Sequence, residues 1–221
     1  MIKLYKCQKP TVLAENADMW TATVMAKIAN GDSLNSTDDA RYRHPAVKAA
    51  LETETHGKCA YCESKLKHIH HADVEHIVPK SLAPELRYQW ENLTLACEIC
   101  NQNKSNKDPK TEFIIDPYVN DPSEHLTFFG TFLFPLGSKY GQNTKTLLDL
   151  NRVPLLVRRH DRLEKIMGII DTILRDDLPM PTRKAIYNDL LSNEASPASE
   201  YSAMITSVIH SLKAKFPAEI L

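Results

Sequence analysis

The sequence predicts an α+β protein, in which a small core of strand, loop, strand and helix is flanked by N-terminal helices and a helical C-terminal region. Three observations support this fold class. Two cysteine pairs, Cys59-x-x-Cys62 and Cys97-x-x-Cys100, enclose short stretches with strand-like alternation. Apolar residues before and after this segment recur mostly at helical spacing. Thirteen prolines and only six glycines are typical of a helix-rich chain whose elements end sharply.

The composition is that of a globular protein with a buried core. The chain has 221 residues, of which 43% are hydrophobic and 25% are charged. It carries 27 basic and 28 acidic residues, so nucleic-acid contacts would have to come from local clusters rather than from the whole-chain charge. Its apolar runs are too short to span a membrane, and residues 1–6 lack the apolar segment of a signal peptide. We therefore expect a cytoplasmic protein with no membrane partner, in which paired cysteines bind metal rather than form disulfides.

The first half of the chain divides into two regions. Residues 1–55 are expected to form an N-terminal helical region of packing elements. Residues 56–110 are expected to form the metal-binding core. Within it, alternation predicts a strand at 74–78 and a second strand at 93–96, and a short helix should follow at 98–107, before an Asp-Pro pair.

The second half is expected to be simpler. Residues 111–142 form a β-rich connector, with one or two strands between Leu126 and Phe134. Residues 143–221 form a helical region that is a candidate for partner docking. An apolar stripe along 156–174 predicts a long helix there, and Ser196-Pro197 predicts the start of the last helix.

The cysteines are candidate ligands of a structural zinc. Zinc prefers four tetrahedral sulfur or nitrogen ligands, and a Cys-x-x-Cys turn supplies two of them from one bend of the backbone. Two such turns leave no open coordination position for a substrate, and the long gap between them has room for a functional insert. The alternative is a coincidental set of buried thiols. The candidate ligands are Cys59, Cys62, Cys97 and Cys100.

A second metal centre is expected beside this zinc. Phosphodiester hydrolysis needs a base for water and a cation on the phosphate. His76 is the candidate base because its ordinary pKa is near neutral. Glu75 and Asn101 offer hard oxygen donors that suit Mg²⁺ or Mn²⁺. A regular strand would point Glu75 and His76 to opposite faces, so a bulge or twist is needed to bring them together.

Further polar residues are weaker candidates. Asp73 could share a strand face with Glu75. Lys104 and Lys107 follow the second cysteine pair and are expected to contact nucleic-acid phosphates. The basic stretch 152–165 is either a solvated helix face or another phosphate contact. Three histidines are expected to lie in the loop before the first strand: His68, His70 and His71.

These residues resemble the HNH endonucleases of the zinc-stapled type. The resemblance covers about residues 56–110, and the whole chain is similar to the HNH subunits of Septu anti-phage systems and their retron-associated relatives. Two less specific stretches, Phe113–Tyr118 and Thr146–Arg152, support the wider similarity. The motif runs Cys59-Ala-Tyr-Cys62, Asp73-Val-Glu-His76-Ile77-Val-Pro79-Lys80, Trp90-Glu-Asn92-Leu93 and Leu95-Ala-Cys97-Glu-Ile-Cys100-Asn101-Gln-Asn-Lys104.

The resemblance implies a ββα-metal fold and assigns roles to single residues. His76 falls on the general base, and Asn92 on an asparagine that braces the loop between the strands. Asn101 falls on the last metal ligand, and Lys104 on a lysine that contacts phosphate. Glu75 falls where many members have a metal-binding aspartate. Its extra methylene leaves the choice between Mg²⁺ and Mn²⁺ open.

The resemblance also implies a function. We expect a metal-dependent endonuclease that cuts DNA to 5′-phosphate and 3′-hydroxyl ends, works with a PtuA-like ATPase of the ABC/SMC-like class, and is in some relatives linked to retron RNA/DNA. Two alternatives stay open. The substrate could be RNA, such as tRNA, or the chain could be a non-catalytic zinc module that binds nucleic acid or protein. The second alternative explains the cysteines but gives no reason for the residues expected to bind the catalytic metal.

Overall fold

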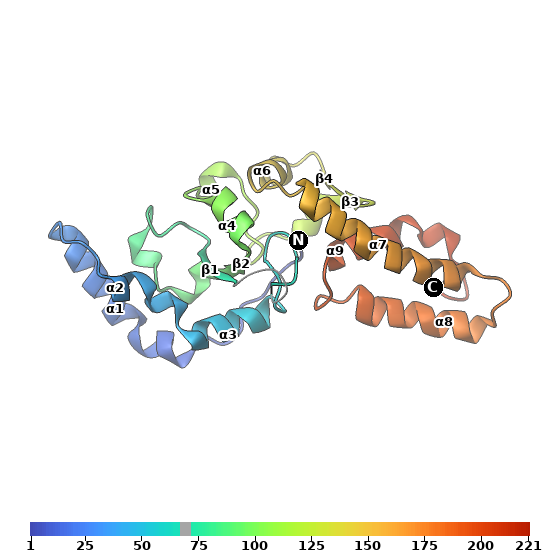
Figure 1. Cartoon of the computed structure of the whole chain (residues 1–221), viewed down its shortest axis with the longest axis horizontal. Coiled ribbons are helices and arrows are strands. Elements are labelled where there is room, and N and C mark those ends of the chain that lie inside the picture. The colour runs from blue at the N-terminus through green and yellow to red at the C-terminus, as the bar shows by residue number, and fades with distance from the viewer. Residues whose placement is uncertain (67–71) are drawn as a thin grey trace.

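The computed structural model describes residues 1–66 and 72–221. The molecule is elongated (Figure 1). Helices α1 to α3 lie at one end, the antiparallel helices α7 and α8 lie at the other, and two small sheets lie between them (Figure 1). Within the described residues, no helix combines the length and apolar character needed to cross a bilayer.

The N-terminal region is helical, as predicted. The long helix α1 (Thr11–Ala29) is followed by the short helix α2 (Ser36–Ala40) and the 3₁₀ turn η1 (Arg41–Arg43). Asn35 begins α2 by accepting a hydrogen bond from the Asp38 amide at 2.8 Å. Helix α3 (Pro45–Glu54) starts with a proline, whose missing N–H costs nothing at that position, and packs on the first sheet.

The central core has the predicted order of strand, loop, strand and helix. Strands β1 (Asp73–His76) and β2 (Leu93–Ala96) pair antiparallel, with Glu75 opposite Thr94. The 3₁₀ turns η2 (Pro84–Leu86) and η3 (Trp90–Asn92) lie in the loop between them, and helix α4 (Glu98–Lys104) follows β2.

Two boundaries in this core differ from the prediction. Strand β1 ends at His76 rather than at Val78, because the Val78 amide donates to the side chain of Asn92 instead of to a neighbouring strand. Helix α4 ends at Lys104 rather than at Lys107. The chain leaves the helix at Ser105, which has a left-handed φ of 48°.

The second half contains a hairpin and most of the remaining helices. The strands predicted in the connector form a two-stranded hairpin, and Gly130 in its turn has a left-handed φ. The last helix begins at Ser202, so the predicted start at Ser196-Pro197 is wrong; the left-handed Tyr201 (φ 55°) immediately precedes that helix. The elements are α5 (Pro109–Glu112), η4 (Pro122–Glu124), β3 (Leu126–Phe129), β4 (Phe132–Pro135), α6 (Lys139–Leu147), α7 (Val153–Leu174), α8 (Met180–Asp189), the π-helical turn η5 (Leu190–Glu194), α9 (Ser202–Ser211) and η6 (Lys213–Lys215).

One hydrophobic cluster runs through the chain. It extends from Leu13 in α1 through Leu93 and Leu95 in β2 to Ile170 in α7 and Ile205 in α9, and all five side chains are fully buried. Helix α9 packs on β3, and α7 packs on α8. The division into four regions at residues 55, 110 and 142 stays a prediction.

Candidate metal centre and active site

The four predicted zinc ligands form one cluster. The Sγ atoms of Cys59, Cys62, Cys97 and Cys100 lie within 4.8 Å of one another, and those of Cys62 and Cys97 are 3.8 Å apart. A zinc ion at the centre of a tetrahedron with Zn–S bonds of about 2.3 Å places its sulfur ligands about 3.8 Å apart. The cluster therefore fits zinc, and its four sulfurs could hold the ion with no coordination position left open.

Two local structures deliver these sulfurs. The first pair lies on a turn that is fastened to β2, since the Ala60 amide donates to the Leu95 carbonyl at 2.9 Å. The second pair opens helix α4, where Cys97 is the N-cap and its Sγ lies 3.5 Å from the Cys100 amide. Backbone N–H groups and the helix dipole at this end favour the thiolate form that binds metal.

The C-terminal region closes around the cysteine cluster. The Arg152 guanidinium lies 3.7 Å from Cys100 Sγ and 3.9 Å from Cys97 Sγ. Burial acts to lower the pKa of Arg152, but the surrounding cysteine thiolates raise it overall. Four thiolates and Zn²⁺ carry a net charge of −2, which the guanidinium offsets in part. On another side, Ser64 Oγ bridges Cys62 Sγ at 3.4 Å and the Tyr201 hydroxyl at 2.9 Å.

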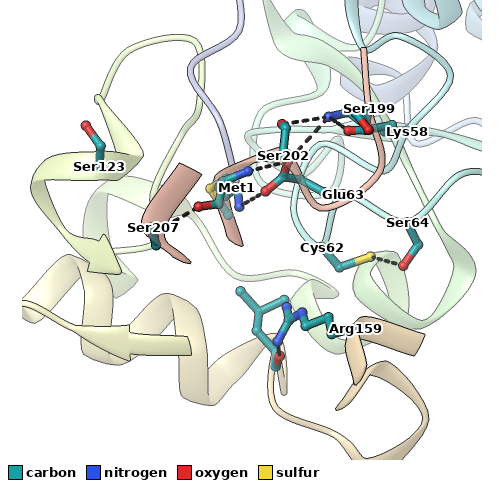
Figure 2. A network of polar contacts seen from close by, with 12 residues as sticks. Met1, Lys58, Cys62, Glu63, Ser64, Ser123, Arg159, Ser199, Ser202 and Ser207 are labelled. Carbon is teal, nitrogen blue, oxygen red and sulfur yellow. Dashed lines mark hydrogen bonds and ion pairs between the residues drawn. The ribbon is translucent and has the colours of Figure 1, made fainter. Parts of the chain in front are cut away.

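A buried ion-pair network lies next to the first cysteine pair (Figure 2). The Glu63 carboxylate pairs with the amino group of Met1 and, at 3.3 Å, with Lys58 Nζ, and it accepts a hydrogen bond from Ser202 Oγ at 2.9 Å. Lys58 also donates to the Ser199 carbonyl at 2.8 Å. Burial alone would raise the pKa of Glu63, but the Met1 ammonium and Lys58 lower it to about 2. The network joins the cysteine turn to the start of α9.

A polar cleft of about 260 Å³ lies beside the cysteine cluster. It is lined by Asp73, Glu75 and His76 of β1 and by Asn101 of α4, and Tyr42 closes it from the N-terminal region. Glu75 and His76 therefore line one cleft although they are neighbours in a strand. His76 is the last residue of β1 and still pairs with Leu93, so the two side chains reach the cleft from the end of the strand.

His76 is held in one orientation within the cleft. Its side chain is buried, and Nε2 lies 3.0 Å from the Arg87 carbonyl. A carbonyl only accepts, so Nε2 carries the proton and Nδ1 keeps a free lone pair. Burial lowers the pKa of His76 to about 4, against the opposing effect of this hydrogen bond. The Tyr42 ring packs edge-on against the imidazole, with 4.5 Å between the ring centroids. The near-neutral pKa expected from the sequence is therefore wrong for the buried side chain. The imidazole is neutral at pH 7, and in this orientation it can accept a proton from water.

The N-terminal region supports this arrangement through residues that sequence reasoning missed. Asp39 of α2 forms ion pairs with the Arg87 guanidinium and, at 2.7 Å, with Lys80 Nζ. Asp39 thereby holds the residue whose carbonyl orients His76. Asp39 and Tyr42 stand outside the motif, and no pattern in the sequence connects them to His76.

The acidic side of the cleft combines three oxygen-bearing side chains. Glu75 Oε1 lies 2.7 Å from Lys104 Nζ, and the buried Lys104 also donates to the His76 carbonyl at 2.9 Å. Burial raises the pKa of Glu75, and Lys104 opposes this effect. Asn101 Nδ2 donates to Asp73 Oδ2 at 3.1 Å, which leaves Asn101 Oδ1 as an acceptor. Two carboxylates and an amide oxygen form a donor set that suits Mg²⁺ or Mn²⁺.

The remaining predicted residues have defined places. Asn92 accepts from the Val78 amide at 2.8 Å and donates to the carbonyls of Val78 and Leu86 at 3.0 and 3.2 Å, so it clamps the loop between β1 and β2. Lys107 is partly buried and donates to the Asn103 carbonyl at 2.9 Å.

The expected nucleic-acid contacts of Lys104 and Lys107 stay predictions. In the structure the Lys104 ammonium is fully buried against Glu75. The three candidate histidines, His68, His70 and His71, lie outside the described residues.

The class of the domain follows from this geometry and from a family comparison. An antiparallel strand pair, a following helix, a four-cysteine cluster and a cleft with a buried histidine lie within one short segment, and the HNH endonuclease family matches residues 59–107. This segment is an HNH endonuclease domain. HNH nucleases depend on a metal ion, in agreement with the oxygen donors of the cleft.

The particular family follows from the whole chain. The chain is 32% identical over 224 residues to the Septu protein PtuB of Bacillus thuringiensis, covering 95% of this chain and 82% of that protein. It is 27% identical over 219 residues to the Septu protein PtuB of Bacillus mycoides (strain KBAB4), covering 76% of this chain and 74% of that protein. The chain belongs to the PtuB family of HNH proteins.

Proposed function

We propose that this chain is a metal-dependent endonuclease that hydrolyses phosphodiester bonds in DNA, as the effector subunit of an anti-phage defence complex. One observation supports the chemistry above all. Nε2 of His76 lies 3.0 Å from a carbonyl, which leaves Nδ1 as a base in the cleft that also holds Glu75 and Asn101. The HNH match and the PtuB relatives support the wider role.

The chain's own residues define the hydrolytic step. Nδ1 of His76 takes a proton from a water molecule, whose oxygen forms a bond to phosphorus. The bond from phosphorus to the 3′ oxygen breaks, and that oxygen takes a proton from water, which gives 5′-phosphate and 3′-hydroxyl ends. Glu75 and Asn101 would hold Mg²⁺ or Mn²⁺, which supplies positive charge at the phosphate when bound. Lys104 holds the Glu75 carboxylate in place at 2.7 Å and opposes the rise in its pKa that burial causes.

The decisive variant is His76→Ala. Removal of a general base is expected to lower the cleavage rate by about 10²- to 10⁴-fold. Supercoiled plasmid and total RNA are incubated with the protein and its ATPase partner in Mg²⁺ and in Mn²⁺, and product ends are identified by ligation and by phosphatase treatment. Zinc content and circular dichroism should match those of the wild type.

His160→Ala is the matched control. The His160 side chain is 63% exposed on α7, and its replacement should leave the cleavage rate unchanged. A His76→Ala protein that cleaves as fast as the wild type would refute the assignment. Cleavage of RNA but not DNA would keep the chemistry and replace the substrate. Zinc-dependent binding without cleavage of either would support the non-catalytic alternative.

We also propose that the defence complex includes a PtuA-like ATPase of the ABC/SMC-like class, bound by residues 143–221. The membership in the PtuB family supports a Septu partner. Helix α7 presents two apolar side chains one turn apart, Val153 and Val157, with exposures of 71% and 53%. Exposed apolar groups on one helix face are typical of protein contacts.

The introduction of charges at these two positions tests this docking surface. The double variant Val153→Lys/Val157→Lys should lose co-purification with the ATPase, because two ammonium groups would have to be buried in the contact. Val119→Lys is the matched control, since Val119 is 73% exposed but lies in the connector. Retained binding by the double variant, or equal loss in the control, would overturn the placement.

A further inference from the structure

A second cavity lies next to the catalytic cleft, in the N-terminal region. It is open to solvent and has a volume of about 650 Å³. Its wall includes Val12 and Trp20 of α1 and also Arg41, Arg43 and His44. Arg43 also lines the catalytic cleft, so one residue borders both cavities.

The lining of this cavity combines apolar and cationic groups. The Arg41 guanidinium lies 5.3 Å from the Trp20 ring centroid and pairs with Asp38 at 3.3 Å. Arg43 is exposed, lies 5.3 Å from the Tyr42 ring, and forms no ion pair with any residue that the structure describes. An aromatic ring and guanidinium planes stack on a nucleobase, and a free guanidinium binds its phosphate.

The position of the cavity restricts which nucleotide it can hold. Tyr42 lines the cleft and His44 lines the cavity, and two residues span at most about 7 Å. A base in the cavity would therefore belong to a nucleotide close to the scissile phosphate. Bases inside a duplex are stacked and expose only their edges in the grooves. Only a base outside the stack can enter an aromatic cavity.

We propose that this cavity binds an unpaired nucleotide of the cleaved strand, with its base against Trp20 and Arg41 and its phosphate on Arg43. The proposal rests on the proposed function, because it places the nucleotide beside the phosphate that His76 acts on. It assigns to the N-terminal region the choice of single-stranded or distorted nucleic acid over a regular duplex. DNA and RNA both carry the base and the phosphate that the cavity would bind, and the experiment below distinguishes between them.

Binding measurements test the proposal. Fluorescent single-stranded DNA, single-stranded RNA of the same sequence and the fully paired duplex are titrated with full-length protein in Ca²⁺, which replaces the catalytic cation. Trp20→Leu and Arg43→Gln should each weaken single-strand binding by about 5- to 150-fold, which corresponds to the loss of one stacked base or one charged contact. Binding of the duplex should change less than threefold. The probe that binds more tightly, the single-stranded DNA or the single-stranded RNA, identifies the natural substrate.

Control variants separate this effect from unfolding and from general charge loss. Trp20 packs against Tyr88, so Trp20→Leu is accompanied by a melting curve, whereas Arg43 is exposed and its replacement keeps the fold. Arg175→Gln removes an arginine that is 55% exposed and directly follows α7, and it should leave all three affinities unchanged. Equal loss of single-strand and duplex binding in Arg43→Gln would overturn the proposal.

A photochemical readout is independent of cleavage. Single strands that carry 5-iodouracil are irradiated on the His76→Ala protein, and the adduct is located by mass spectrometry. An adduct on Trp20 or His44 supports the proposal. Adducts confined to other segments, or no strand binding at all, overturn it, and loss of ATPase binding in Trp20→Leu would identify a protein contact instead. If the adduct forms at the cavity while the wild type cleaves nothing, the nuclease assignment fails and the binding site stands.

Discussion

At the scale of single residues, Asn92 fixes the loop that carries the orienting carbonyl of Arg87. Its amide makes three hydrogen bonds, two of them to the backbone of Val78 and one to the Leu86 carbonyl. The amide and carbonyl of Val78 form no backbone hydrogen bond among the described residues, whereas the Leu86 carbonyl also accepts one from the Gln89 amide at 3.2 Å. Asn92 therefore adds side-chain hydrogen bonds to those that the loop makes within its own backbone.

Asn92→Ala should be destabilising because it leaves the amide and the carbonyl of Val78 without their hydrogen-bond partner and removes one of the two donors to the Leu86 carbonyl. Unsatisfied buried polar groups of this kind cost about 1–3 kcal/mol each, so the free energy of unfolding should fall by about 2–4 kcal/mol. Urea denaturation at neutral pH with zinc present measures the change. Asn92→Asp keeps the acceptor for the Val78 amide, so its free energy of unfolding should lie between those of the wild type and Asn92→Ala. An Asn92→Ala protein as stable as the wild type would contradict the proposed clamp.

At the scale of elements, the cysteine cluster joins the turn before β1, the start of α4 and the start of α7. Arg152 precedes α7 and lies against two of the sulfurs. The guanidinium offsets part of the negative charge of a zinc–thiolate centre, so zinc affinity should depend on a residue that is not itself a ligand.

Arg152→Gln should accelerate the loss of zinc. Groups around a metal centre that are not ligands typically contribute about 10- to 100-fold in metal affinity. Competition with a chromogenic chelator measures this loss. Cys97→Ser removes a ligand and shows the largest loss of zinc to be expected; it should also lower the stability of the protein. Arg158→Gln on the exposed face of α7 is the control. Zinc release from Arg152→Gln at the wild-type rate would show that the guanidinium has no influence on the metal.

At the scale of the whole molecule, Glu63 connects parts of the chain that are far apart in sequence. Its carboxylate contacts Met1, Lys58 and Ser202, and all of these groups are buried (Figure 2). Glu63 also has a left-handed φ of 64°, an uncommon conformation for glutamate. The HNH domain and the start of α9 are therefore joined by hydrogen bonds of buried charged groups as well as by apolar contact.

Glu63→Gln should lower the free energy of unfolding by about 3–5 kcal/mol, because it leaves Lys58 and the Met1 ammonium buried without a counter-charge. The amide can keep the hydrogen bond from Ser202, so the loss reports the charge. Thermal and urea unfolding at pH 7 with zinc present measure it. Glu124→Gln is the control, since Glu124 is exposed and has no ion pair among the described residues. A loss below about 1 kcal/mol would mean that the network is energetically neutral.

The sequence was informative where chemistry is local. Cysteine spacing predicted the cluster, and alternation and helix signals predicted β2 and α4, because turns and short elements depend on neighbouring residues. The sequence did not predict contacts between residues that are far apart in the chain. The ion pair of Asp39 with Arg87, 48 positions apart, has no local signature.

Charged residues in helices were also misleading. Arg159 stands among exposed residues of the basic stretch, but it is 1% exposed and donates to the Leu150 carbonyl at 2.8 Å. Lys104 is likewise buried. A periodic pattern of charge does not reveal that a long side chain can reach inward to an unsatisfied carbonyl.

The carbonyl of Arg87 has one more consequence. Every amino acid carries the same carbonyl, so the group that sets the tautomer of His76 cannot be deleted by substitution at position 87. Only the path of the backbone can move it. The ion pair between Asp39 and Arg87 helps to fix that path, so a replacement of Arg87 can move the carbonyl only indirectly. Insertions or deletions in the loop should therefore be tolerated far less than replacements.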